Sequence, residues 1–80
     1  MTMYKAMFAD EDGENTHDSA TWEAESVTEA AEMHCDHHQQ ELVSDGIDRP
    51  WVLVLDVDGH ACLVNVTIYY DAVFDGQAKP

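Results

Sequence analysis

The side chains best suited to chemistry are gathered in one short segment, at His34, Cys35, His37 and His38. Imidazole and thiolate groups bind Zn²⁺, and the i, i+4 spacing of His34 and His38 places two imidazoles on one helix face. The same stripe of the helix is also the one expected to face a core, where histidines hydrogen-bond to backbone or water. The sequence therefore leaves two interpretations, a metal site at His34, Cys35 and His38 or histidines at the margin of a core. The second is the more common outcome.

A second motif is the D-x-D-G run at residues 56–59, which follows the apolar residues 52–55. It resembles the first motif of haloacid-dehalogenase-type phosphatases, in which the first Asp attacks phosphorus and the second assists the leaving group. The resemblance ends at His60, where that family has Thr or Val. Eighty residues cannot form the doubly wound sheet of that family, and Asp58-Gly59 favours a tight turn, so we interpret the run as a turn. With no nucleophile elbow or oxyanion hole indicated, we expect a non-enzymatic protein without cofactors.

Carboxylates dominate the composition, with 17 Asp and Glu against three Lys and Arg and a net charge of −14. Such a surface argues against direct binding to nucleic acid or to anionic membranes, because both need Lys and Arg to neutralise phosphates. Residues 10–14 resemble a calcium loop, but Gly13 comes two positions too early for the EF-hand pattern. Three interpretations remain: a solvated acidic surface, a ligand for a basic partner, and divalent-cation binding.

Nine carboxylates are candidate partner-binding residues, at a loop tip, on a strand and on an exposed helix face: Asp10, Glu11, Asp12, Glu14, Glu23, Glu25, Glu29, Glu32 and Asp36. Those on the helix recur at one-turn intervals, roughly 5–6 Å apart. Duplex DNA carries one negative charge per about 1.7 Å of axis, so rows of carboxylates form a crude imitation of a phosphate track. A basic groove built for nucleic acid would attract such rows over long range and hold them through Arg–carboxylate pairs.

The element expected to organise the chain is a hairpin over residues 50–70. A two-residue type I′ turn at Asp58-Gly59 pairs Val57 with His60 and Leu55 with Cys62. This register predicts one apolar face beneath a helix, made of Trp51, Leu53, Leu55, Val57, Cys62, Val64, Val66 and Ile68. It leaves another apolar set uncovered on the opposite face: Met3, Met7, Val52, Val54, Leu63 and Tyr69. An uncovered apolar face favours homodimerisation or partner docking.

The remaining elements follow from alternation and capping. Alternating residues predict strands over 2–9 and 19–25, and the S-x-x-E box at Ser26 predicts a helix that runs to about Val43. Residues 71–74 can add a short edge strand, and 76–80 are expected to be a frayed tail. The sequence therefore predicts a single α+β domain over residues 1–80 with a two-layer ββαββ order. Its antiparallel sheet has four strands, or five with the edge segment, and one helix packs on one face.

The chain contains only two cysteines, Cys35 and Cys62, without a C-x-x-C spacing. It shows neither a signal peptide nor an apolar run of about 18 residues. We therefore expect a cytoplasmic protein whose reduced thiols act as small hydrophobic side chains.

In organisation the chain resembles small, acidic, phage-encoded anti-CRISPR proteins. The resemblance rests on about 80 residues, a Glu-Ala-Glu-Ser passage at 23–26 from strand to helix, an Ala-bearing helix between hairpins, and high acidity. It implies stoichiometric inhibition of a CRISPR surveillance complex in the host bacterial cytoplasm, by occupation of the basic surface that takes target DNA. It assigns no individual residue. Two alternatives remain: a small acidic cytoplasmic domain that homodimerises, with or without adaptation to high salt, and a His/Cys metal-binding module.

Overall fold

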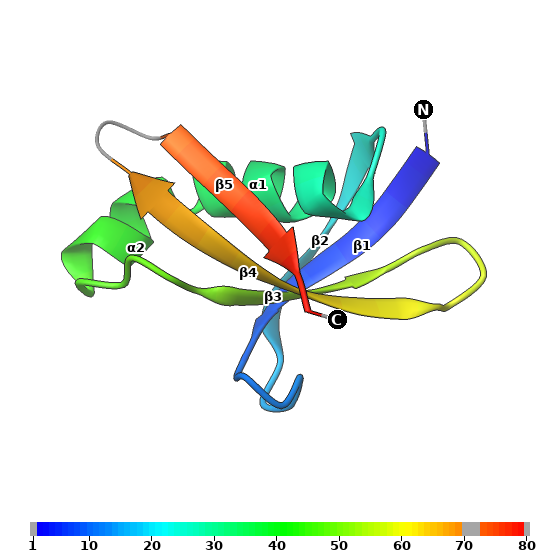
Figure 1. Cartoon of the computed structure of the whole chain (residues 1–80), viewed down its shortest axis with the longest axis horizontal. Helices are drawn as coiled ribbons and strands as arrows, with labels where there is room; N and C mark the ends of the chain where they lie inside the picture. The colour runs from blue at the N-terminus through cyan, green and yellow to red at the C-terminus, as the bar shows by residue number, and fades with distance from the viewer. Residues whose placement is uncertain (1, 70–72, 80) are drawn as a thin grey trace.

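A computed structural model describes residues 2–69 and 73–79 and shows an α+β architecture (Figure 1). Its elements are β1 (Thr2–Ala9), β2 (His17–Ala24), α1 (Val27–His37), α2 (Gln39–Ser44), β3 (Trp51–Leu55), β4 (Ala61–Tyr69) and β5 (Val73–Ala78). All strand pairs are antiparallel, in the order β2-β1-β3-β4-β5. α1 crosses one face of the sheet and contacts all five strands. The α+β class is confirmed, but the element order is ββααβββ rather than ββαββ.

The helical segment is interrupted at His38, so the prediction of a single helix was wrong. α1 begins where expected, with the Ser26 hydroxyl accepting the Glu29 amide at 3.1 Å. At His38 the backbone leaves helical geometry (φ −102°, ψ 18°), and its N–H is shared between the carbonyls of His34 and Cys35. Histidine is one of the weaker helix formers, and three of the five residues 34–38 are histidines. The chain therefore restarts as the short α2.

The β3–β4 hairpin has a longer loop than the predicted two-residue turn. Leu55 pairs with Ala61 and Val54 with Cys62, which leaves residues 56–60 as the loop. The Asp56 carboxylate organises this loop, because its Oδ1 accepts the amides of Asp58 and His60, each at 2.9 Å. A side chain that satisfies two loop amides offers an alternative to the type I′ turn. The predicted register was therefore wrong by one residue.

A one-residue change of register moves every side chain of β3 to the other face of the sheet. Val52 and Val54, predicted to be uncovered, are fully buried beneath α1 together with Val64 and Val66. Trp51, Leu53 and Leu55, predicted to form the core, instead alternate onto the face away from α1. The core of the protein is thin, and Ala24, Ala30 and Ala31 let α1 approach the sheet closely.

The face away from α1 is covered in part by other segments of the chain. Met7 lies on this face, paired with Leu53, yet it is only 8% exposed. A Cβ placed on Gly13 would lie 3.9 Å from Leu53, so the β1–β2 loop packs against the sheet there. Lys79 Nζ stands 5.7 Å from the centre of the Trp51 ring. The homodimer interface expected on this face thus has less uncovered apolar surface than the sequence suggested.

The C-terminal segment, predicted to fray from residue 76, continues the sheet instead. β5 pairs with β4 from Val73 to Ala78, and the Lys79 amide donates to the Leu63 carbonyl at 2.8 Å. Of the predicted edge strand, residues 71 and 72 lie outside the described residues, as do Tyr70 and Pro80. No helix in the described ranges is long and apolar enough to cross a membrane.

Candidate functional site

The negative charge of the protein is not balanced by internal cations. Across residues 2–69 and 73–79, no Lys or Arg forms an ion pair with a carboxylate, and the ion pairs present are His17–Asp18, His38–Glu41 and His60–Asp56. Each of these pairs depends on a histidine, which carries a positive charge only when it is protonated. The carboxylates of the described residues therefore keep their charge uncompensated.

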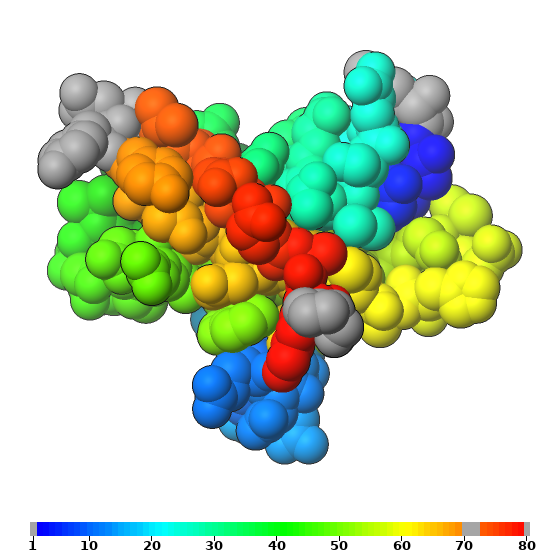
Figure 2. All heavy atoms as spheres, viewed as in Figure 1, coloured from blue at the N-terminus to red at the C-terminus, as the bar shows by residue number. Residues whose placement is uncertain are grey.

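One group of predicted contact residues surrounds a shallow hollow between α1 and β5. This acidic hollow has a volume of about 300 Å³ and is lined by Glu29, Glu32, Met33, Asp36 and Phe74. Figure 2 shows β5 as an orange-to-red band beside the green and cyan surface of the α1 region. The hollow thus combines three carboxylates, called the rim residues below, with the apolar side chains of Met33 and Phe74.

The rim residues are less exposed than the sequence suggested, because β5 packs beside them. Asp36 is exposed, whereas Glu29 and Glu32 are half-buried. Glu32 Oε2 accepts the Gly76 amide at 2.7 Å and so fastens β5 to α1. Glu32 therefore links β5 to α1 through its carboxylate. Among the described residues, Glu29 and Asp36 are the rim carboxylates without such a hydrogen bond.

The second predicted group lies in the β1–β2 loop, which the Asp10 carboxylate stabilises through hydrogen bonds. Its Oδ1 accepts the amides of Asp12 and Glu14 at 2.9 Å, and its Oδ2 accepts from Asn15 at 2.8 Å. The backbone hydrogen bond from Glu14, with those from its neighbours, lowers the pKa of Asp10 below its usual value. Glu11 and the other loop carboxylates remain exposed at the tip.

The structure does not bring all nine predicted residues onto one surface. Figure 1 shows the β1–β2 loop at the bottom of the view and α1 at the top, at opposite ends of the molecule. Glu23 is exposed on the sheet face away from α1, because its neighbour Ala24 is buried beneath the helix. Glu25 is exposed in the passage between β2 and α1. The predicted site therefore divides into the acidic hollow, the loop tip and the end of β2.

The predicted metal ligands His34, Cys35 and His38 do not converge. His34 is fully buried, and its Nδ1 accepts from Trp22 Nε1 at 3.0 Å. Burial lowers the pKa of His34 to about 4 and raises the pKa of Cys35 to about 12, so the thiol stays protonated. Of these three residues, only His38 belongs to a group of converging metal-binding atoms in the described part of the chain. Its neighbours are Glu41, at the i+3 position, and Asp18, which is distant in sequence and which no local spacing could have indicated.

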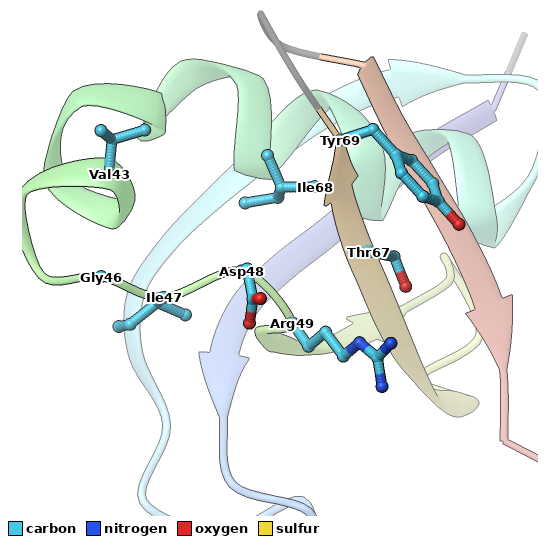
Figure 3. A pocket seen from close by; sticks show the side chains of 8 residues that line it. All are labelled: Val43, Gly46, Ile47, Asp48, Arg49, Thr67, Ile68 and Tyr69. Atoms are coloured by element: carbon cyan, nitrogen blue, oxygen red, sulfur yellow. The ribbon is translucent and has the colours of Figure 1, made fainter.

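A second, more apolar hollow lies between the α2–β3 connection and β4 (Figure 3). It has a volume of about 570 Å³ and is lined by Val43, Gly46, Ile47, Asp48, Arg49, Thr67, Ile68 and Tyr69. Its apolar residues include Val43 and Tyr69, with 64% and 51% of their surfaces exposed. Arg49 extends along its lower edge in Figure 3. The sequence did not indicate this hollow, because its residues come from segments joined only by the fold.

Comparison of the chain with protein-family models, with characterised proteins and with solved structures gives no match. The functional argument therefore depends on the residues of this chain.

Proposed function

We propose that the protein is a non-enzymatic inhibitor that binds the basic surface of a nucleic-acid-binding protein, acting as an acidic mimic of DNA. The observation that carries this proposal is the uncompensated charge: a net −14 with no Lys or Arg paired to a carboxylate in the described residues. A surface of this kind attracts a basic groove over long range, at rates that fall as salt rises.

The acidic hollow supplies the chemistry for the closest contacts. An arginine side chain presents a planar cation and an apolar stem. The carboxylates of Glu29 and Asp36 would receive the guanidinium, while Met33 and Phe74 would pack against the stem. This arrangement suits arginine better than a surface of carboxylates alone.

A CRISPR surveillance complex is the partner that we propose, because the organisation of the chain resembles anti-CRISPR proteins and such complexes hold DNA in basic channels. The exposed loop carboxylates Glu11, Asp12 and Glu14 would extend the contact away from the acidic hollow. Inhibition would then be competitive with target DNA and would need one inhibitor per DNA-binding surface.

The experiment is competition between this protein and target DNA for purified CRISPR surveillance complexes. We expect the protein to displace DNA at about 50 mM salt and to lose most of this ability by about 500 mM, because salt screens exposed charges. Buffers should contain a chelator, so that metal binding does not contribute. DNA binding that is unaffected by excess protein at low salt would contradict the proposal.

A charge-matched pair of variants separates a defined contact from net charge. Glu29→Gln with Asp36→Asn removes two rim charges, and Asp45→Asn with Asp48→Asn removes two exposed charges elsewhere. We expect the first pair to weaken inhibition at least about tenfold, since hydrogen bonds to charged groups carry much of such an interface. The second pair should change it little. Equal losses in both would show that net charge alone acts.

A further inference from the structure

Three metal-binding side chains converge where the start of β2 meets the junction of α1 and α2. They are Asp18, His38 and Glu41, each with a ligand atom within 4.8 Å of the other two. We propose that they bind a divalent ion of the zinc class, with water or the nearby His17 completing its shell. Two carboxylates and one imidazole are common ligands of such ions. This site is independent of the proposed partner surface.

The distance between His38 and Glu41 fits a shared ion better than a direct hydrogen bond. His38 Nδ1 and Glu41 Oε2 are 3.5 Å apart. This is longer than the donor–acceptor distance of about 2.7–3.2 Å that is usual in an N–H···O hydrogen bond. Two ligands about 2.0–2.2 Å from a tetrahedral ion lie roughly 3.4 Å apart. The pair therefore already has the separation of two ligands of one ion.

His38 is held firmly by its surroundings, as an ordered ligand would be. Its ring packs against Phe8 and His34, with centroids 5.2 Å and 4.7 Å away, and only 15% of the side chain is exposed. The interruption of the helix at His38 sets its place between α1 and α2. A ligand whose ring is fixed by packing loses little freedom when it binds metal.

A hollow at the surface reaches two of the three side chains. Asp18 and Glu41 lie on the wall of a hollow of about 250 Å³, which His17 also lines, so an ion has access and room for a water. His34, which packs against His38, is not a ligand, because its Nδ1 accepts from Trp22 and its Nε2 therefore carries the proton.

In a second group, Asp56, Asp58 and His60, the potential ligand atoms lie close together only because the three residues share one turn. It lies in one short loop, where Asp56 already accepts two amides. The His60 side chain is 82% exposed. Since the loop explains these contacts, His60 serves as the control histidine.

The test is calorimetric titration of zinc chloride into the metal-free protein. We expect one ion per chain, and binding at least about tenfold weaker in His38→Gln, Asp18→Asn and Glu41→Gln. His60→Gln should bind zinc as the wild type does. Asn suits position 18, because the backbone there has φ +54°, which Asn tolerates better than most residues.

Glu41→Gln keeps the test decisive if His38→Gln disturbs the fold, because Glu41 is largely exposed. Zinc binding that is unchanged in Glu41→Gln, or no binding at millimolar zinc, would overturn the proposal. So would calcium competing as well as zinc, since that would show diffuse attraction to carboxylates. None of these outcomes bears on inhibition measured in chelator.

Discussion

At the scale of single residues, the contact between Trp22 and His34 defines a protonation state. Trp22 can only donate, so Nδ1 of His34 must be an unprotonated acceptor and the ring must be neutral. Protonation would place two donors face to face inside a buried cluster that includes Phe8 and His38. Burial is the main cause of the lowered pKa of His34, about 4.

This histidine predicts a loss of stability in mild acid. As the pH falls from 6.5 to about 4, His34 takes up a proton in the unfolded chain but stays neutral in the folded protein. The free energy of unfolding therefore falls by about 3 kcal/mol in total. Urea unfolding at pH 7 and pH 4.5, in chelator, measures the effect. Relief of charge repulsion acts in the opposite direction, so the wild type should be compared with His34→Gln. Parallel pH profiles for the two proteins would contradict the prediction.

At the scale of elements, the register of the β3–β4 hairpin is the main point on which sequence and structure differ. Alternation alone allows either face of β3 to be buried, because Val52–Leu55 is apolar at every position. The Asp56 side chain decides the register by accepting two loop amides. Local signals identified the start of α1, with its Ser26 cap, and the buried face of β4 at Val64 and Val66.

A pair of isosteric substitutions tests this register. Val54 is fully buried and Val57 is 73% exposed, whereas the type I′ register would bury Val57. Val54→Thr places a hydroxyl in an apolar core and should lower the free energy of unfolding by about 1–3 kcal/mol. Val57→Thr should have almost no effect. Chemical denaturation measures the free energy of unfolding of both variants. A larger loss of stability in Val57→Thr than in Val54→Thr would support the two-residue type I′ turn instead.

Gly76 allows β5 to pass close beneath α1. A Cβ at this position would lie 3.2 Å from both the Thr28 carbonyl oxygen and Val64 Cγ1. Gly76→Ala should therefore destabilise the protein by about 1–3 kcal/mol, as other overpacked sites do. Gln77→Ala, in the exposed neighbouring position, is the control for thermal unfolding. A Gly76→Ala protein as stable as Gln77→Ala would show that β5 is free to move outward.

At the scale of the whole molecule, a net charge of −14 on 80 residues works against compactness. The charge could be counted from the sequence, but its distribution could not. The β1–β2 loop and α1 lie at opposite ends in Figure 1, a matter of tertiary arrangement that no local pattern records. Asp18 meets His38 and Glu41 through a long-range contact of this kind as well.

Self-repulsion predicts that salt stabilises the fold. Raising sodium chloride from about 20 mM to about 500 mM shortens the screening length from tens of ångströms to a few, so the melting temperature should rise by several degrees. Calorimetry in chelator measures this rise. A melting temperature that stays constant or falls with salt would mean that repulsion between the carboxylates does not destabilise the folded state.

Lys79 donates from its Nζ to the Glu11 carbonyl at 3.1 Å, which brings the end of β5 to the tip of the β1–β2 loop. A purification handle fused after the last residues of the chain would emerge beside one of the two proposed contact regions. Pull-down through such a handle would obstruct the surface it is meant to probe. The choice of where to attach the protein to a resin thus follows from a single lysine.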